Sequence, residues 1–176
     1  MKESVSILIS EEVIKQRIDE LAAEIINDYN GQSITLVCAL KGAIIFMADL
    51  ARKLPNQVEF DFIGTSSYGD GMASTGRVQL TKEPEFDPTD KNILLVEDIL
   101  DTGHTLAFLR RYYRDKNPAS VRTCCLLDKP ERRVVSGLEA DYTGFCIPDK
   151  FVVGYGLDYA QRYRNLPYIG VLNISE

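Results

Sequence analysis

Two periods in the apolar residues of this chain predict helices and strands in turn. Between residues 11 and 29, apolar side chains recur every three or four positions, which predicts an amphipathic helix capped by Ser10 and ended by Gly31. Residues 34–40, ITLVCAL, form a nearly continuous apolar run, which is typical of a strand buried on both faces. Residues 43–54 return to helical spacing and predict a second helix.

The rest of the chain continues this alternation. The further predicted elements are strands at 58–66, 77–81, 92–96 and 121–127 and a helix at 106–113. Residues 142–146 and 151–153 are short and β-like, which predicts a small appended lobe. Strands that alternate with helices predict one α/β domain over residues 1–176, with a mainly parallel central sheet flanked by helices.

The composition is that of a globular domain. Of the 176 residues, 45% are hydrophobic and 26% are charged, which supplies a core and excludes general disorder. The formal net charge of −6 argues against a nucleic-acid partner, although a few basic groups and backbone amides can still bind a phosphate. No apolar run approaches the roughly 20 residues of a membrane span, and the first residues lack the features of a signal peptide. We therefore expect a cytoplasmic protein with no membrane partner.

The four cysteines show no metal-binding or disulfide pattern. Cys38, Cys124, Cys125 and Cys146 include no CxxC pair, and His104 is the only histidine. We therefore expect reduced, largely buried thiols and no zinc site.

Acidic residues and a glycine turn follow the predicted strand 92–96. Ligands of parallel sheets bind beyond the carboxyl ends of the strands, and Glu97 and Asp98 stand at such an end. As hydrogen-bond acceptors they suit a sugar diol or a metal-bound diol. A strand end capped by acids and followed by an N-capped helix is the simpler structural interpretation. The alternative is a phosphate site, in which backbone N–H groups and a helix N-terminus face an anion; it comprises Asp101, Thr102, Gly103, His104 and Thr105.

The whole run 93–106, ILLVEDILDTGHTL, closely resembles the phosphoribosyl-pyrophosphate loop of the type I phosphoribosyltransferases. The resemblance implies that Glu97 and Asp98 hold the ribose hydroxyls and that residues 101–105 hold the 5′-phosphate. It places Asp101 close to an incoming base. It also implies that family's fold, in which a mainly parallel sheet is joined by a small hood lobe and a flexible hairpin loop, and a bacterial source.

Two further segments agree with this family. Lys41 alone reads as an exposed lysine at a strand end, but the resemblance implies a pyrophosphate-binding turn at Leu40, Lys41 and Gly42 that can hold a cis bond before the lysine. The stretch 64–76, GTSSYGDGMASTG, reads as a plain hairpin loop. Its resemblance to a flexible catalytic loop implies a lid that excludes water, formed by Ser66, Ser67, Tyr68 and Gly69.

The C-terminal run 147–159, IPDKFVVGYGLDY, matches the base-binding segment of hypoxanthine-guanine phosphoribosyltransferases almost residue for residue. Phe151 offers a face on which a purine can stack, and the backbone of Val152 can pair with its edge. Lys150 can donate a hydrogen bond to a 6-oxo group, and Asp158 can ligate Mg²⁺. Without the resemblance, Phe151 reads as core and Lys150 as surface.

The resemblance also covers two more basic residues. It implies that Arg164 contacts pyrophosphate and that Lys129 lies near the active-site acid, in the purine site.

These observations predict a purine-salvage enzyme. It would transfer 5-phosphoribosyl from phosphoribosyl pyrophosphate to N9 of hypoxanthine or guanine, giving IMP or GMP and pyrophosphate. Asp101 would be the general base, and Glu97, Asp98 and Asp158 would hold Mg²⁺. The family further implies a homodimer or homotetramer.

Other function classes fit less well. A nucleotide-sensing, RNA-binding regulator with the same fold would keep the phosphate turn but present a basic face, which the charge of −6 disfavours. A receiver-type signalling domain also places acids at strand ends, but the predicted hairpin and C-terminal lobe fit it poorly. A P-loop nucleotidase is excluded because GxxxxGK[ST] does not occur.

Overall fold

The computed structural model describes residues 2–55, 58–67 and 78–175, and helices and strands alternate along most of that length. The elements are β1 (Lys2–Ile9), α1 (Glu11–Tyr29), β2 (Ile34–Leu40), α2 (Ile44–Ala51), β3 (Val58–Ser67), β4 (Val78–Lys82), β5 (Asn92–Leu100), α3 (His104–Arg114), β6 (Ser120–Asp128), β7 (Tyr142–Cys146), β8 (Val152–Val153) and β9 (Ile169–Ser175). A short 3-10 helix, Pro130–Arg132, follows β6.

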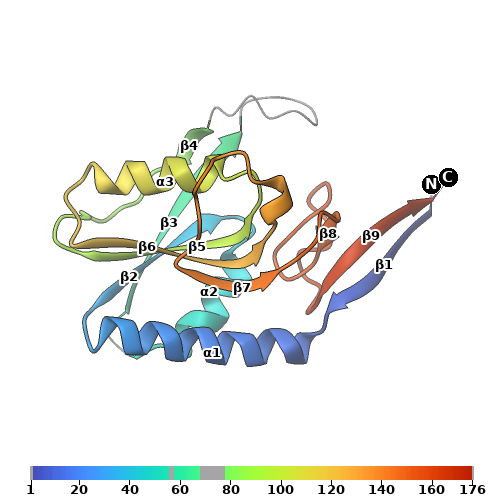
Figure 1. Ribbon diagram of the computed structural model, residues 1–176, viewed down its shortest axis with the longest axis horizontal. Helices are drawn as coiled ribbons and strands as arrows, with labels where there is room; N and C mark the ends of the chain where they lie inside the picture. The colour runs from blue at the N-terminus through green and yellow to red at the C-terminus, as the bar shows by residue number, and fades with distance from the viewer. Residues whose placement is uncertain (1, 56–57, 68–77, 176) are drawn as a thin grey trace.

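The larger of two sheets has the strand order β4-β3-β2-β5-β6-β7. All neighbouring pairs are parallel except β3 and β4, which are antiparallel. Helices α1 and α2 cover one face and α3 covers the other (Figure 1). The predicted α/β class with a mainly parallel sheet is therefore confirmed.

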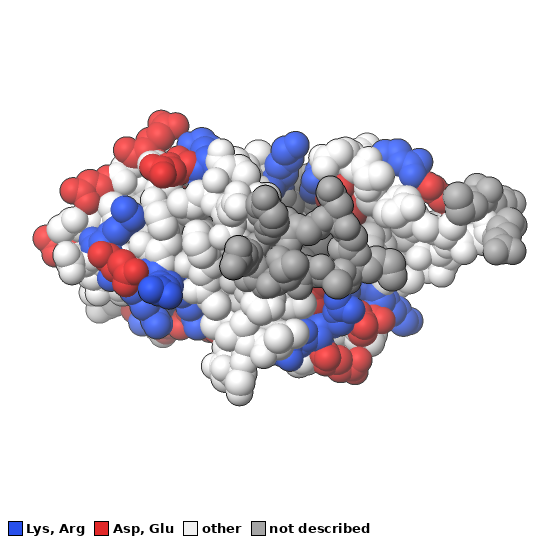
Figure 2. Space-filling view, turned by 90° about the horizontal axis from the view of Figure 1, so that it is seen from above, with Lys and Arg blue, Asp and Glu red and all other residues white. Residues whose placement is uncertain are grey.

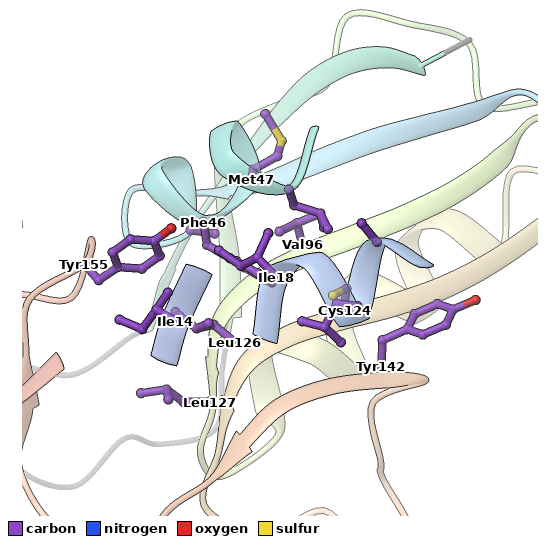
Figure 3. Close-up of a cluster of buried hydrophobic side chains, with 14 of the residues drawn as sticks. Ile14, Ile18, Phe46, Met47, Val96, Cys124, Leu126, Leu127, Tyr142 and Tyr155 are labelled. Carbon is purple, nitrogen blue, oxygen red and sulfur yellow. The ribbon is translucent and has the colours of Figure 1, made fainter. Parts of the chain in front are cut away.

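Both faces of the central strands are buried, which explains their nearly continuous apolar sequences. In β2, Leu36 and Cys38 pack in the cluster beneath α1 and α2, whereas Val37 and Ala39 pack in the cluster beneath α3. Figure 3 shows the first cluster, in which side chains of both helices meet those of β5 and β6; they include Ile14, Ile18, Phe46, Val96, Cys124 and Leu126.

The smaller sheet has the order β1-β9-β8 and is antiparallel. Strands β1 and β9 form a ribbon that projects from the body of the molecule, with both chain ends at its tip (Figure 1). The predicted appended lobe is only partly correct, because β7 pairs with β6 in the main sheet and only β8 joins the small one. The apolar pattern did not identify β1.

Several element bounds differ from the prediction. The helix at 11–29 is confirmed, and Ser10 Oγ accepts a hydrogen bond from the Val13 N–H at 3.4 Å. Its C-cap, however, is Asn30 in the left-handed region. Strand β5 continues to Leu100 rather than ending at residue 96, because it stays paired with β6 up to Asp128.

Three of the four cysteines, Cys38, Cys124 and Cys125, are buried as expected, whereas Cys146 is exposed. None of the helices in the described part of the chain combines the length and the apolar character that a membrane crossing requires. On the described part of the face seen in Figure 2, acidic and basic side chains lie interspersed.

Candidate active site

The carboxyl ends of the parallel strands open into a cavity of about 660 Å³. Its walls come mainly from the β2–α2 turn, the run from the end of β5 to the start of α3, the loop after β6 and the segment after β8. The sequence-predicted residues that line it are Leu40, Lys41, Gly42, Glu97, Asp98, Asp101, Thr102, Gly103, His104, Thr105, Asp158 and Arg164. The fold thus brings four separate segments of the chain to one edge of the sheet.

A second cavity of about 400 Å³ adjoins the first and shares Asp98, Asp101 and Asp158 with it. Three other predicted residues, Lys129, Phe151 and Val152, line it. Lys150 is absent from the described residues that line either cavity, and it is exposed. The expected contact of its side chain with a purine therefore stays a prediction.

Glu97 and Asp98 lie inside β5 rather than after it. Glu97 is 6% exposed, and its Oε1 is buried without a hydrogen-bond partner among the described residues. Burial, and next the charge of Asp98, raises the pKa of Glu97 well above its ordinary value. Burial likewise raises the pKa of Asp98 to about 6, although the Ile99 N–H donates to its Oδ1 at 2.8 Å. These carboxylates are therefore poorly solvated and lack cationic partners sufficient to offset burial.

The turn after β5 leads directly into the N-terminus of α3. Gly103 caps this helix at φ +93°, a conformation that residues with a side chain rarely adopt. The carbonyl of Thr102 accepts hydrogen bonds from the N–H groups of Val134 at 3.0 Å and Val135 at 3.2 Å. The loop after β6 thus supports the turn from behind while the N-terminus of α3 faces the cavity.

The β2–α2 turn approaches β5 closely. The Leu40–Lys41 peptide is cis, as the family resemblance allowed. A Cβ on Gly42 would lie 1.6 Å from Oδ2 of Asp98, so that only glycine fits there. Gly156 packs on the same turn, since a Cβ on it would lie 1.9 Å from the Gly42 carbonyl oxygen.

Sequence reasoning missed two basic residues of the loop after β6. Arg132 lines both cavities, and its Nε donates to Asp101 Oδ1 at 3.1 Å. Arg133 holds the backbone of the same region, because its Nη1 donates to the carbonyls of Leu100, at 3.1 Å, and of Asp101. The only sign of these two arginines in the sequence is the basic run after a buried strand. It indicates a place in the site only once β5 and β6 are known to be neighbours.

The second cavity contains a buried lysine. Lys129 is 7% exposed, and its Nζ donates to the Lys150 carbonyl at 2.6 Å. The same Nζ lies 3.8 Å from Oδ1 of Asp149, a second cavity residue that the sequence did not indicate. Phe151 is 55% exposed and lines the second cavity.

The acids predicted to bind a metal line one cavity, and Asp158 has protein partners there. Asp158 pairs with Arg164 at 2.8 Å through Oδ1, and its Oδ2 accepts the Gln161 N–H at 2.8 Å. Within the described part of the chain, no group of three His, Cys, Asp or Glu side chains is arranged to hold a metal ion. Asp158 lines both cavities together with Asp98, and its role as a magnesium ligand stays a prediction.

Comparison with known proteins gives one consistent result. A family model described as a phosphoribosyl transferase domain matches residues 4–160. A hypoxanthine phosphoribosyltransferase of Buchnera aphidicola is 47% identical over 97% of both chains. A hypoxanthine-guanine phosphoribosyltransferase of Streptococcus pneumoniae is 48% identical over 94% of this chain and 92% of its own. The solved structure of a hypoxanthine-guanine phosphoribosyltransferase from Bacillus anthracis superposes with a TM-score of 0.91 at 44% identity, covering 98% of this chain and 100% of that one.

Proposed function

Because this chain belongs to the phosphoribosyl transferase family and its relatives are purine-salvage enzymes, we propose a specific reaction for its two adjoining cavities. It is the transfer of 5-phosphoribosyl from phosphoribosyl pyrophosphate to N9 of hypoxanthine or guanine, with IMP or GMP and pyrophosphate as products. The observation that carries the proposal is the position of Asp101, which lines both the phosphate-turn cavity and the cavity of Phe151 and Lys129. A group at this boundary lies between a bound sugar phosphate and a bound base.

The sugar phosphate occupies the larger cavity. The backbone N–H groups of residues 101–105 and the N-terminus of α3 hold the 5′-phosphate, with hydroxyl donors from Thr102 and Thr105. Glu97 and Asp98 accept hydrogen bonds from the ribose hydroxyls. As positive charge develops at the ribose C1 atom, these two carboxylates stabilise it.

The base occupies the smaller cavity. It stacks on Phe151, while the backbone of Val152 meets its edge. We propose Lys129, which lines this cavity, as a hydrogen-bond donor to the 6-oxo group beside Lys150, whose contact with the base stays the expectation from the sequence. Asp101 accepts the proton that the base loses as its N9 bonds to the sugar.

Pyrophosphate lies against the β2–α2 turn. The backbone of Leu40, Lys41 and Gly42 and the guanidinium of Arg164 line this part of the cavity. Both are suited to an anion, since the turn offers N–H groups and Arg164 a fork of donors.

Magnesium fits the carboxylate pair. The buried, unpartnered oxygen of Glu97 and the neighbouring Asp98 are hard oxygen donors. Burial disfavours their negative charge, and a bound cation would offset that cost. Mg²⁺ bound there would supply positive charge against the leaving pyrophosphate. Asp158, which lines the same cavity and pairs with Arg164, would be the third ligand that the sequence predicted.

Some expectations stay predictions. Tyr68 and Gly69 of the proposed lid lie outside the described residues, and Ser66 and Ser67 belong to the end of β3. We propose that residues 1–176 act as one domain with the small sheet as its hood. A homodimer or homotetramer in the cytoplasm, without nucleic acid, is the expected form.

The test is a direct assay of each base. Purified protein is incubated with phosphoribosyl pyrophosphate, Mg²⁺ and hypoxanthine, guanine, xanthine or adenine, and the nucleotides are separated and quantified. We expect IMP or GMP from the 6-oxopurines and no AMP from adenine, which has no 6-oxo group for Lys129. Failure to form any nucleotide from the three 6-oxopurines would contradict the proposal.

A further inference from the structure

The ring of Phe151 is held from outside the cavity by Tyr159. The two ring centroids lie 5.7 Å apart and their planes meet at 87°, an edge-to-face contact. Tyr159 is absent from the described residues that line either cavity. Its contact therefore fixes the tilt of the Phe151 ring without occupying the space of a base.

Tyr159 is in turn held by Arg162. The backbones of the two residues exchange hydrogen bonds, Tyr159 N–H to the Arg162 carbonyl at 3.1 Å and the reverse at 3.0 Å. The guanidinium of Arg162 also lies over the Tyr159 ring, 5.7 Å from its centroid. The two residues between them, Ala160 and Gln161, have φ values of +49° and +65°, so this turn has one tightly defined shape.

Arg162 is anchored on the other end of the chain. Its Nη2 donates to Oε1 of Glu3 at 2.7 Å, and the Tyr163 hydroxyl donates to the same carboxylate. Hydrogen bonds from Tyr163 and Arg162 lower the pKa of Glu3, which keeps it ionised as their partner. Glu3 belongs to β1, so residues 159–163 are attached to the N-terminal strand.

The same small sheet also holds the backbone of Phe151. The Leu172 N–H of β9 donates to the Phe151 carbonyl at 3.0 Å, and Leu172 is paired with Val5 of β1. Both the main chain and the ring of Phe151 are thus linked by contacts to β1 and β9, whose projecting ribbon is seen in Figure 1. The residues of the phosphate turn and of the β2–α2 turn make none of these described contacts.

We propose that Glu3, Arg162 and Tyr159 are positioning residues for the purine, acting as a relay that holds the Phe151 ring at its stacking angle. The inference rests on the proposed stacking of the base on Phe151. It makes the N-terminal strand part of the base-binding machinery. Its loss should weaken binding of the base more than binding of phosphoribosyl pyrophosphate, because Arg164 is also held from outside the turn 159–162, by the Gly156 carbonyl.

The test separates the Michaelis constants of the two substrates. In Tyr159→Leu, KM for hypoxanthine should rise about two- to tenfold, the size of an edge-to-face aromatic contact, and KM for phosphoribosyl pyrophosphate should change much less. Arg162→Gln and Glu3→Gln should act in the same direction, and Arg162→Lys should restore most of the loss by keeping the ion pair. Asp19→Asn is the matched control, because it removes another exposed ion pair of 2.7 Å, to Lys53, and neither of these residues lines the base cavity.

An equal rise in both Michaelis constants would overturn the relay, since it would mean a general disturbance of the fold. So would an unchanged KM for hypoxanthine in Arg162→Gln, an exposed position where the protein still folds if Tyr159→Leu does not. Phe151→Leu distinguishes failure of the positioning role from failure of the proposed function. A normal KM for hypoxanthine in that variant refutes the stacking role and the relay, whereas absence of nucleotide formation by the unsubstituted protein refutes the proposed function itself.

Discussion

Arg132 donates from Nε to Oδ1 of Asp101 at 3.1 Å, and its Nη1 lies 3.7 Å from Oδ2 of Asp149. One guanidinium therefore bridges the two cavities and holds the proposed proton acceptor at their boundary. The carboxylate of Asp101 and the group that orients it are separate side chains. Their contributions can be measured independently.

Asp101→Asn should reduce kcat by roughly 10²- to 10⁴-fold, the usual contribution of a general base, with little change in KM for phosphoribosyl pyrophosphate. Arg132→Gln keeps the carboxylate and should lose much less. Steady-state kinetics with saturating hypoxanthine measures both. Turnover in Asp101→Asn equal to that of the unsubstituted protein would remove Asp101 from the base role.

The sequence predicted those parts of the fold that depend on local pattern. The bounds of the helix at 11–29 and of the strand at 34–40 are confirmed because the apolar pattern of each lies within the segment itself. The assignment of Tyr142–Cys146 to a separate lobe was wrong because the sequence of a five-residue strand does not indicate which strand it pairs with. Its place beside β6 is decided by a parallel pairing, of Tyr142 with Cys124, that no local rule reveals.

The same distinction applies to the candidate site. The turn at 101–105 could be predicted because its acids, glycine and helix start are contiguous. Arg132 and Asp149 enter the site only through the side-by-side arrangement of β5 and β6 and the return of the chain after β7. Lys129 and Lys150 are both lysines, so the sequence alone does not distinguish them. The structure does, because Lys129 is buried and Lys150 is exposed.

Lys129→Met should lower kcat/KM for hypoxanthine and guanine by about ten- to a hundredfold, the loss of one hydrogen bond from a charged donor. Lys150→Met is the matched comparison for the other candidate donor, and we expect a smaller loss in it because Lys150 is exposed. Thermal unfolding of both variants excludes a folding defect, since Lys129 is buried. The reverse ranking of the two variants would return the 6-oxo contact to Lys150.

The carboxylate pair in β5 should make the free protein less stable at neutral pH than in mild acid. A carboxyl group whose folded pKa is raised stabilises the fold fully below its unfolded pKa, and that contribution is lost as the pH rises through the folded pKa. For Asp98 this window runs from about 4 to about 6. Asp98→Asn should therefore raise the free energy of unfolding by on the order of 1–3 kcal/mol at pH 7.5, because a tenfold difference in proton affinity between the folded and unfolded chain corresponds to about 1.4 kcal/mol.

Urea unfolding of the unsubstituted protein and of Asp98→Asn, at pH 7.5 and at pH 4.5 without magnesium, measures this difference. The advantage of the variant should shrink at the lower pH. Asp19→Asn, on an exposed ion pair, should show no comparable gain. An Asp98→Asn variant that is destabilised at pH 7.5 would show that the buried carboxylate is compensated in the free protein.

Gly42→Ala should damage the site without unfolding the protein. Its new Cβ would lie 1.6 Å from Asp98 Oδ2, a separation that requires Asp98 or the turn to move by roughly 1 Å, and a displacement of that size at a reacting centre costs about 10²-fold in rate. Gly137→Ala is the control, because Gly137 also resists a side chain, at φ +70°, but has no neighbour within 4 Å of the added atom. That variant should lose about 1–2 kcal/mol of stability through strain and keep its activity per folded molecule. Because the two substitutions add the same methyl group, an equal loss of activity per folded molecule in both would attribute the effect to a general disturbance of the fold rather than to the contact between the β2–α2 turn and Asp98.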